Sequence, residues 1–389
     1  MPKKGVLIAF GELFLKSKGV REIFKKKLIN NFFFYLKKEG IKFNVHFFHD
    51  RIFFETEETK KALKIAKNIF GITWFGESFY FPSLNKDNKN DKNFCLLESF
   101  IKENYPKWIK KDETFALRIR KNRGTIEKLA QNIKRKVDLS KPKRELFVEK
   151  RKNDWFLYFK KLKGMGGFPV GASGKVLVLI SGGIDSPVAA FLANKRGVEN
   201  VWLHFHSFPL VSNASIEKIK ELTNIFLKYQ PHLKVYFIPF KDAQMEIKTI
   251  APSHYRVLLY RRLMLKIAQK IAKKEDCFAL ITGESLGQVS SQTLPNMRII
   301  QEQVKIPVLR PLISFDKEEI VNLAKKIKTF SISIKPQEDC CTLFVLKHQT
   351  GFGNIKKIKE LEKKLNINKI IKEIFKKIEV KIFKYPFLK

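Results

Sequence analysis

The feature that most constrains the fold is a glycine turn that directly follows an apolar run in the second half of this 389-residue chain. Residues 176–180 read Val-Leu-Val-Leu-Ile, and residues 181–186 continue as Ser-Gly-Gly-Ile-Asp-Ser before Pro187. The apolar run predicts a buried strand, the glycines allow a tight turn, and proline is favoured in the first turn of a helix. This order of strand, turn and helix indicates a parallel sheet covered by helices.

The same turn carries groups that suit a phosphate. The backbone N–H groups of Gly182 and Gly183 can approach an anion, and the helix N-terminus adds partial positive charge. Ser181 and Ser186 can donate their hydroxyl hydrogens to phosphate oxygens. A carboxylate repels phosphate, so we interpret Asp185 as a Mg²⁺ ligand that bridges to a leaving pyrophosphate. The turn lacks the Gly-Lys-Ser/Thr ending of a Walker A loop, and an ordinary connection without a ligand is the alternative interpretation.

The rest of residues 175–389 continues the alternation of strands and helices. The predicted strands are residues 176–180, 201–205, 235–238 and 278–282. The predicted helices between them are residues 187–196, 214–229 and 253–274. Asp316 and Glu319 form a capping-box pattern at the start of a further helix, and residues 354–389 predict helices with a short final strand. We therefore expect an α/β domain with a doubly wound parallel sheet.

The chain before this domain predicts a smaller α+β arrangement. Its predicted strands are residues 5–10, 41–48 and 51–56, and its predicted helices are residues 20–38 and 57–69. This β-α-β-β-α order indicates a ferredoxin-like module, which we place at residues 1–58. Residues 59–163 form a second unit with strands at 114–120, 146–150 and 154–160 and a helix at 125–137. Residues 164–174 contain five glycines and a proline, which predicts a linker or a structured loop.

The net charge points toward a polyanionic partner. The chain has 77 Lys and Arg against 38 Asp and Glu, a formal charge of +39, which favours RNA or DNA. Because 63 of the basic residues are Lys, a compositional bias toward lysine explains part of this charge. The candidate RNA-binding residues of the second unit are Arg118, Arg120, Lys121, Arg123, Lys134 and Arg135. A solvated basic face is the alternative interpretation for each of them.

The compartment follows from cysteine content and hydropathy. Four cysteines in this length do not make a disulfide framework, so we expect a reduced, cytoplasmic protein. The sequence has no uncharged apolar run of about 18 residues, which excludes a transmembrane helix. An anionic membrane is the second candidate for the polyanionic partner, after nucleic acid, and we expect no membrane partner. Cys95 and Cys277 lie beside apolar residues and are interpreted as packing residues, whereas Cys340 and Cys341 follow Pro336 in an irregular stretch where a thiol could be exposed.

Several motifs in order resemble the PP-loop ATP pyrophosphatases and, among them, the tRNA 4-thiouridine synthetases in their form without a rhodanese domain. The motifs are residues 10–16, 164–174, 181–190, 260–264, 282–293, 310–312 and 338–344. The resemblance covers nearly the whole chain. It implies a ferredoxin-like module, a THUMP RNA-binding domain at residues 59–163, and a PP-loop catalytic domain at residues 175–389.

The resemblance also implies an activity and a nucleotide site. ATP, with Mg²⁺, would adenylylate the C4 oxygen of the uridine at nucleotide 8 of tRNA, and persulfide sulfur would then displace AMP to give 4-thiouridine. Besides the glycine turn, the implied nucleotide-binding residues are Leu179, Ile180, His204, Phe205, Arg261, Gly283 and Gln292. Ligands of open α/β sheets lie at strand ends, where these residues are expected. A core position for Leu179 and Ile180, a satisfied His204 and a solvated Arg261 are the alternatives.

The resemblance places the thiolation chemistry on Cys341, with Cys340 as a second candidate or a resolving thiol. The implied partners are tRNA and a cysteine desulfurase or another donor of persulfide or sulfide; a homodimer is one state that the sequence allows. The printed sequence ends at Lys389 without a rhodanese domain, which leaves open where the persulfide is carried. The rival functions are another PP-loop modification of RNA, by 2-thiolation or amide formation, and a non-catalytic tRNA-binding protein.

Overall fold

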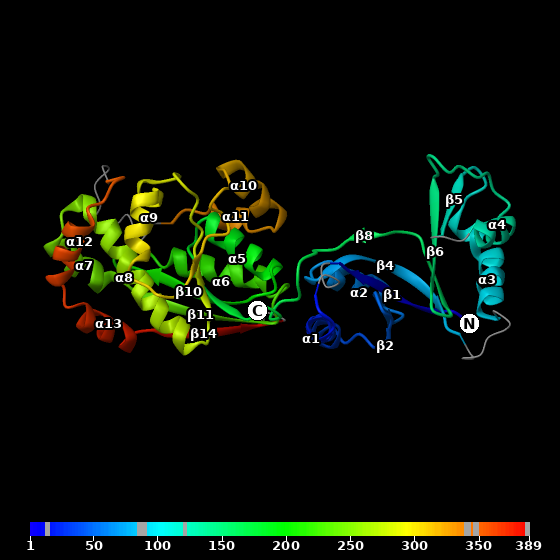
Figure 1. The fold of residues 1–389 in the computed structure, drawn as a ribbon, viewed down its shortest axis with the longest axis horizontal. Helices are drawn as coiled ribbons and strands as arrows, with labels where there is room; N and C mark the ends of the chain where they lie inside the picture. The colour runs from blue at the N-terminus through cyan, green and yellow to red at the C-terminus, as the bar shows by residue number, and fades with distance from the viewer. Residues whose placement is uncertain (12–15, 84–91, 120–122, 338–343, 345–349, 386–389) are drawn as a thin grey trace. The chain divides into compact units, whose positions relative to one another are not determined.

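The computed structural model describes the chain except for residues 12–15, 84–91, 120–122, 338–343, 345–349 and 386–389 (Figure 1). It divides into two compact units, Met1–Gly167 and Phe168–Lys389. The boundary lies within residues 164–174, and the start of this segment is structured. The backbone N–H of Gly166 donates to the carbonyl oxygen of Ile72 at 2.8 Å.

The first unit is built on one sheet of eight strands in the part that the structure describes, in the order β2-β3-β1-β4-β7-β6-β5, with β8 also paired to β4. The strands are β1 (Lys3–Phe10), β2 (Asn44–Phe47), β3 (Arg51–Glu55), β4 (Ile72–Phe81), β5 (Phe115–Ile119), β6 (Arg144–Arg151), β7 (Asp154–Tyr158) and β8 (Leu162–Lys163). The helices are α1 (Lys18–Lys38), α2 (Thr59–Ala66), α3 (Lys92–Trp108) and α4 (Arg123–Gln131). The ferredoxin-like start of the chain is confirmed.

The strand β4 is the main element that the sequence analysis does not include. It completes the β-α-β-β-α order as a fourth strand, and it pairs antiparallel with both β1 and β7. Its sequence contains Gly76, Glu77 and Ser78, and these residues interrupt the apolar pattern that indicates a strand. The sheet nevertheless buries Ser78 completely, and its hydroxyl donates to the carbonyl oxygen of Leu157 at 3.2 Å.

The helix predicted at residues 125–137 is shorter in the structure. It is α4, which ends at Gln131, so Lys134 and Arg135 lie after the helix and not on it. The cause is a return of the chain to β5: the N–H of Phe115 donates to the carbonyl of Lys136, and the carbonyl of Phe115 accepts from the N–H of Asp138. Backbone groups engaged with a strand cannot also continue a helix.

The second unit contains a six-stranded sheet in the order β13-β12-β9-β10-β11-β14 within the described residues. The strands are β9 (Lys175–Leu179), β10 (Glu199–His206), β11 (His232–Pro239), β12 (Ala279–Ile281), β13 (Val308–Leu309) and β14 (Glu379–Lys384). Neighbouring strands are parallel except β14, which runs antiparallel to β11. The expected doubly wound parallel sheet is confirmed, with one antiparallel edge strand.

Helices cover both faces of this sheet (Figure 1). They are α5 (Asp185–Lys195), α6 (Ala214–Phe226), α7 (Lys241–Ile250), α8 (Ser253–Lys274), α9 (Leu294–Gln301), α10 (Lys317–Lys326), α11 (Phe330–Ser333), α12 (Ile355–Lys363) and α13 (Ile367–Lys376). Along β10, Trp202 packs its ring 4.8 Å from that of Phe226 in α6, whereas Leu203 belongs to the core beneath α8. The capping box of Asp316 and Glu319 at the start of α10 is confirmed.

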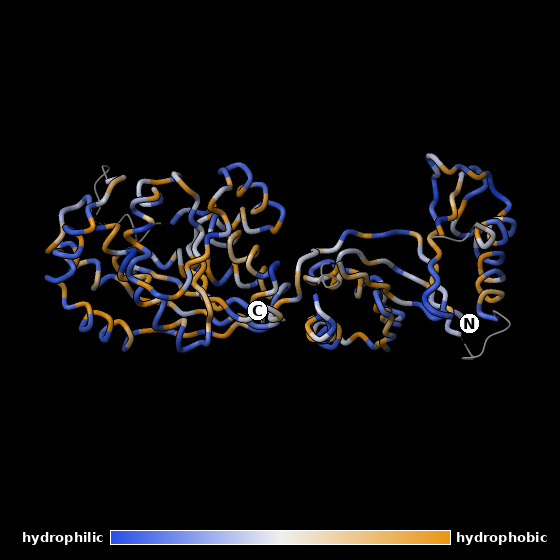
Figure 2. The backbone as a smooth tube through the Cα atoms, in the orientation of Figure 1, coloured by the Kyte–Doolittle hydropathy of each residue, from blue (hydrophilic) through white to orange (hydrophobic). Residues whose placement is uncertain are grey.

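Hydropathy follows the same layering. Hydrophobic and hydrophilic residues alternate along most helices of both units, as expected for helices that bury one side (Figure 2). Among the residues that the structure describes, none of the helices combines the length and the apolar character needed to cross a membrane.

Candidate active site

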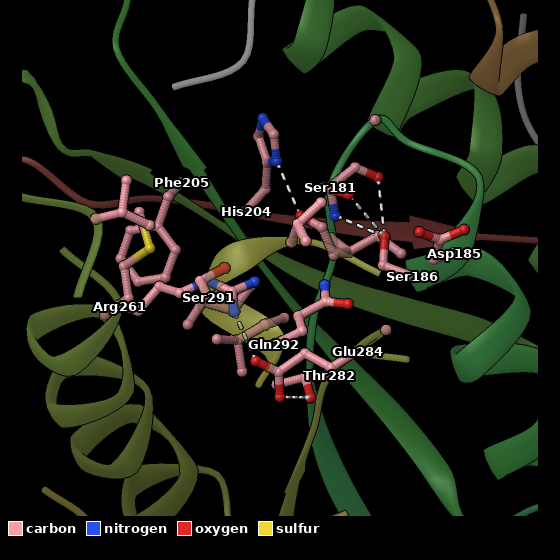
Figure 3. Close-up of a pocket in the computed structure, with 18 of the residues that line it drawn as sticks. Ser181, Asp185, Ser186, His204, Phe205, Arg261, Thr282, Glu284, Ser291 and Gln292 are labelled. Atoms are coloured by element: carbon pink, nitrogen blue, oxygen red, sulfur yellow. Dashed lines mark hydrogen bonds and ion pairs between the residues drawn. The ribbon is translucent and has the colours of Figure 1, made fainter. Parts of the chain in front are cut away.

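The strand order of the second unit fixes where a ligand can bind. From β9 the chain continues to its neighbour β10 on one side, and later reaches β12 on the other side. In open α/β sheets, ligands bind at the carboxyl ends of the strands where the direction of crossover reverses. A cavity of about 630 Å³ lies there, lined by residues that follow β9, β10 and β12 (Figure 3).

The glycine turn forms one wall of this cavity. The N–H of Ser181 donates to Oγ of Ser186 at 2.8 Å, and the N–H of Gly183 donates to Oγ of Ser181 at 3.3 Å. The two hydroxyl oxygens lie 3.1 Å apart (Figure 3). The helix α5 begins at Asp185, so its N-terminus and both hydroxyl groups lie at the same point. This is an arrangement that binds an anionic oxygen.

Gly283 makes the turn and the end of β12 fit together. A Cβ atom at residue 283 would lie 2.7 Å from the backbone nitrogen of Ser186 and 2.8 Å from its Cα. Those distances are shorter than any real Cβ contact, so only glycine allows the chain after β12 to pass the start of α5. The close approach is to the protein's own helix; the approach of Gly283 to ATP stays a prediction.

The cavity brings together nearly all of the residues that the sequence analysis assigns to the nucleotide. The residues from that set that line it are Leu179, Ile180, Ser181, Gly182, Ser186, His204, Phe205, Arg261, Gly283 and Gln292. Asp185 lines it as well, whereas Gly183 lies in the turn but is not among the lining residues. The side-chain amide oxygen of Gln292 accepts from the N–H of Ser285 at 3.2 Å, which holds this residue in the wall.

Asp185 is held by two side chains from other elements. One carboxylate oxygen lies 2.6 Å from Nζ of Lys317, and the other accepts from Nε2 of Gln288 at 3.0 Å. Its side chain is 21% exposed, so the carboxylate is accessible from the cavity. Oxygen donors of this kind are the ligands that Mg²⁺ prefers. Among the described residues, no cluster of three or more His, Cys, Asp or Glu could hold a metal ion without further ligands.

A buried carboxylate organises the part of the wall that follows β12. Glu284 is 7% exposed, and its two oxygens lie 2.7 Å from Nη1 of Arg261 and 2.7 Å from Nε of Arg310. The hydroxyl of Thr282 donates to the same carboxylate at 2.8 Å. Burial acts to raise the pKa of Glu284, but the two guanidinium groups and the hydrogen bonds lower it below its ordinary value. One carboxylate between two arginines leaves net positive charge beside the cavity.

The neighbouring arginines of α8 lie in different surroundings, because adjacent positions on a helix point in different directions. Arg261 lines the cavity, whereas Arg262 is 1% exposed and pairs with the carboxylate of Glu362 at 2.7 Å. Arg262 also donates to the carbonyl oxygen of Ile299. It therefore stabilises the packing of α8, α9 and α12 and is absent from the cavity wall.

His204 lies in the wall as a neutral side chain. It is 3% exposed, and burial lowers its pKa to about 4. Nδ1 lies 3.0 Å from the carbonyl oxygen of Ile180, and Nε2 lies 3.1 Å from Oγ of Ser215. A carbonyl oxygen only accepts, so Nδ1 carries the hydrogen and Nε2 accepts from the Ser215 hydroxyl. Both ring nitrogens are satisfied, and the ring acts as a fixed part of the wall.

The structure describes two of the four cysteines, Cys95 and Cys277. Cys340 and Cys341 lie outside the described residues. Cys277 is buried as expected, and burial raises the pKa of its thiol to about 12. The packing interpretation of Cys95 is wrong, because this residue of α3 is exposed: it lies on the face of the helix away from Leu97 and Ile101, which are the buried ones.

The candidate RNA-binding residues belong to the first unit. Arg118 pairs with Glu145 at 3.0 Å and donates to the carbonyl oxygen of Leu139 at 2.9 Å. Arg135 donates to the carbonyl oxygens of Ile109 and Lys110, and Lys134 is exposed. Arg120 and Lys121 lie outside the described residues, as does the side chain of Arg123, the first residue of α4.

No sequence motif indicates a role for four further residues that the structure places in or beside the cavity: Ser215, Glu284, Gln288 and Lys317. Glu284 directly follows the strand end at Thr282-Gly283. Because ligands of open α/β sheets bind at strand ends, this position was the one sequence signal that could have identified Glu284 as a residue of the site. Lys317 follows the capping residue Asp316, a pattern that identifies the start of a helix but not its neighbour in space. Its contact with Asp185 spans 132 residues, which no local pattern reports.

Comparison with known proteins adds independent findings. The model of the family described as thiamine biosynthesis protein (ThiI) matches residues 171–367, and the model of the ThiI ferredoxin-like domain matches residues 5–76. The protein named "Probable tRNA sulfurtransferase" of Caldanaerobacter subterraneus subsp. tengcongensis is 37% identical over 380 residues, with 95% of this chain and 97% of that protein covered. A protein of Thermoanaerobacter sp. (strain X514) with the same name is 38% identical to this chain, and the match covers 94% of this chain and 96% of that protein.

A solved structure agrees with these sequence relatives. It is described as a 4-thiouridine synthetase–RNA complex with bound ATP, and its protein chain is 30% identical to this one. The TM-score is 0.86, and the match covers 98% of this chain and 99% of that chain. The similarity therefore includes both units, not only the sheet that carries the cavity.

Proposed function

This chain belongs to the ThiI family of tRNA sulfurtransferases, and we propose that it uses ATP to activate a uridine of tRNA and replaces the C4 oxygen of that uridine with sulfur, giving 4-thiouridine. The observation that carries the proposal is the convergence of the glycine turn, Asp185 and Arg261 on one cavity at the switch point of the sheet. We assign the modified uridine to nucleotide 8 of the tRNA, as the resemblance implies.

The turn is proposed to bind the phosphates of ATP. The uridine C4 oxygen attacks the α-phosphorus, a new P–O bond forms, and the bond to pyrophosphate breaks. N–H groups of Gly182 and Gly183, the hydroxyls of Ser181 and Ser186 and the N-terminus of α5 stabilise the charge on the departing pyrophosphate. The activated uridine then carries AMP, a much better leaving group than the original oxygen.

Asp185 is the residue that would hold Mg²⁺, together with phosphate oxygens. Its carboxylate fits because it lines the cavity and because its partners, Lys317 and Gln288, are side chains that can exchange for a metal. When bound, the ion supplies neutralisation of phosphate charge. Lys317 remains close enough to contribute a second positive charge to the same phosphates.

The remaining cavity residues are proposed to hold the adenosine. Leu179, Ile180, His204 and Phe205 supply the ends of β9 and β10, and their apolar surfaces suit the base. Gln292 would donate its amide hydrogens to the nucleotide, and Gly283 would leave room for it. Arg261, oriented by Glu284, would face the phosphates with the nitrogen that the ion pair leaves available.

The sulfur is proposed to arrive on Cys341, with Cys340 as the resolving thiol. The chain supports this assignment, because Gln337 lines the cavity and four residues reach at most about 14 Å. The terminal sulfur of a Cys341 persulfide attacks C4, and AMP leaves with the original oxygen. A thiolate, from Cys340 or an external dithiol, then cleaves the S–S bond, which leaves sulfur on the uridine and a disulfide on the thiols.

The finer assignments about partners follow the same resemblance. A cysteine desulfurase is the proposed persulfide donor, and a homodimer in the cytoplasm is the proposed state of the enzyme. The proposed tRNA contacts are Arg118, Arg120, Lys121, Arg123, Lys134 and Arg135.

The decisive experiment is direct synthesis. The protein is incubated with ATP, Mg²⁺, sulfide and unmodified tRNA, and 4-thiouridine is detected by its near-ultraviolet absorbance and by mass spectrometry. Sulfide attacks C4 directly, so this assay tests activation without any persulfide carrier. A tRNA with cytidine at nucleotide 8 is the matched control. ATP and tRNA binding without 4-thiouridine would contradict the enzyme assignment and favour the non-catalytic alternative.

The thiol assignment needs a second arm with a persulfide donor. Cys341→Ser should abolish transfer from a cysteine desulfurase and leave sulfide-driven thiolation within about threefold of wild type. Cys95→Ser is the matched control, because that thiol is exposed in the first unit. Full persulfide-driven activity in both Cys341→Ser and Cys340→Ser would show that neither thiol carries the sulfur.

A further inference from the structure

A buried lysine lies just behind the glycine turn, and the proposed reaction does not use it. Lys218 of α6 is 3% exposed, and it is not among the residues that line the cavity. Nζ donates to the carbonyl oxygen of Ser333 at 3.0 Å, and it lies 3.5 Å from the carbonyl oxygen of Gly182. A buried ammonium group is costly unless its hydrogens are satisfied, so these two carbonyls are its compensation.

Burial and two charged neighbours act on the pKa of this lysine. Burial lowers the pKa of the Lys218 ammonium group, nearby Lys335 lowers it further, and Glu221 acts in the opposite direction. Lys335 and Glu221 also pair directly at 2.6 Å, which ties the chain after α11 to α6. The lysine therefore lies where α6, the end of α11 and the glycine turn meet.

A second contact joins the same two segments. A Cβ atom at Gly182 would lie 1.9 Å from the side-chain oxygen of Gln337, so the amide of Gln337 occupies the space beside this glycine. Residues 333–337 therefore touch the turn twice: through Lys218 at Ser333 and through Gln337 itself. These contacts join segments that lie about 150 residues apart in the chain.

We propose that Lys218 is a positioning residue that fixes the phosphate-binding turn relative to residues 333–337, and so couples activation of the uridine to sulfur transfer. The inference rests on the proposed function. One ammonium group shared by two backbone carbonyls sets the separation of the two segments, whereas two independent contacts would let each move separately. Without it, the adenylylated uridine still forms, but sulfur reaches it less often.

The coupling can be measured as the number of pyrophosphate molecules released for each 4-thiouridine formed. When water replaces sulfur at the activated uridine, AMP is lost and uridine is regenerated, so pyrophosphate is released without product. We expect wild type to release about one pyrophosphate per 4-thiouridine and Lys218→Met to release at least five. The Kd for tRNA should stay within twofold, since the substitution removes no contact of the first unit.

The test compares three variants with the wild type, using ATP, Mg²⁺, tRNA and a desulfurase-loaded persulfide. Lys218→Arg keeps the charge and two donors, and it should restore the ratio to within twofold of wild type. Lys220→Met is the matched control, because Lys220 lies two residues away on α6 and pairs with Glu217 at the surface. Its ratio should equal that of the wild type.

The outcomes separate the inference from the proposed function. An unchanged pyrophosphate ratio in folded Lys218→Met overturns the positioning role, provided that the wild type makes 4-thiouridine. An inactive wild type overturns the proposed function instead. If Lys218→Met does not fold, Gln337→Ala decides the matter: it opens the other contact on Gly182, and a ratio equal to wild type overturns the coupling.

Discussion

The two units use their paired charged side chains in different places. In the second unit, charges from distant parts of the chain converge on one cavity: Glu284 pairs with Arg261 and Arg310, and Asp185 pairs with Lys317. In the first unit, charged residues pair along the sheet. Asp50 binds both Arg51 and Arg151 at 2.9 Å, and Arg118 pairs with Glu145 of the neighbouring strand. The same residue types therefore line a cavity in one unit and pair across the strands of a sheet in the other.

Topology explains the difference. A parallel doubly wound sheet has one edge where all strands end and one point where crossovers diverge, so residues after β9, β10 and β12 must meet. The mainly antiparallel sheet of the first unit alternates strand directions, and its strand ends are distributed over two edges. Where strand ends meet at one site, we expect single substitutions to have large effects on activity or stability. Where strand ends are distributed over two edges, we expect the effects to be small and additive.

The largest expected effect tests the convergence at Asp185. Replacing Asp185 by Ala should lower the rate of 4-thiouridine formation about a thousandfold, or roughly 4 kcal/mol, because it removes the proposed ligand of the Mg²⁺ that neutralises the phosphates. Single-turnover kinetics with saturating tRNA give this rate. Asp242→Ala is the control, since Asp242 is an exposed carboxylate of the same unit that pairs with Lys377. A rate for Asp185→Ala within tenfold of wild type would contradict the proposed role.

The second effect tests the buried carboxylate. Glu284→Gln leaves the guanidinium groups of Arg261 and Arg310 without their counter-charge, so the free energy of unfolding of the second unit should fall by about 3 kcal/mol. Pulse proteolysis in urea, with peptides from residues 168–389 followed by mass spectrometry, measures this unit separately. Glu217→Gln removes a surface pair and should cost less than about 1 kcal/mol. Equal losses in the two variants would show that Glu284 is not a structural centre of the site.

The position of the cavity was predictable because its main signals are local. The motif of residues 181–186 directly follows a buried strand in the sequence. The class of the sheet then determines where the ends of its strands meet. Lys317 and Lys218 were not predictable, because their contacts with the turn depend on the packing of α10, α6 and α11. No pattern within a few residues of either lysine reports a partner more than 30 residues away.

The first unit shows which local signals fail. β4 was not predicted because Gly76, Glu77 and Ser78 give it a polar centre, although the sheet satisfies these residues. The end of α4 was placed too late because the pairing of Phe115 with residues 136 and 138 is a tertiary contact. In both cases hydrogen bonds between segments distant in the chain override the local propensity.

The third effect uses pH to test whether His204 is fixed as a neutral side chain. Its pKa in the folded protein is about 4, below the ordinary value of 6.5, so the unfolded chain binds the extra proton between these values. Stability therefore rises with pH in this range, and the second unit should lose about 2 kcal/mol from this residue between pH 7 and pH 5. The measurement is the same proteolysis at both pH values, with His204→Gln as the comparison. A pH dependence identical in the two proteins would show that His204 is not responsible.

The smallest effect tests the distributed surface of the first unit, and it is the complement of the Asp185 experiment. Arg118 already pairs with Glu145 and is partly exposed, so Arg118→Ala should weaken tRNA binding only about two- to fivefold, which is below about 1 kcal/mol. The slope of log K against log salt should fall by about one phosphate contact, and the rate at saturating tRNA should not change. Filter binding from 50 to 200 mM salt measures the slope.

The control is Lys61→Ala, which removes an exposed lysine of α2 that pairs with Glu58 and should leave the slope unaltered. An unchanged slope in Arg118→Ala would show that this arginine does not contact the RNA. A hundredfold loss of affinity for tRNA would show instead that the first unit concentrates its binding energy in single residues, as the second unit does. The contrast between the two units would then not hold.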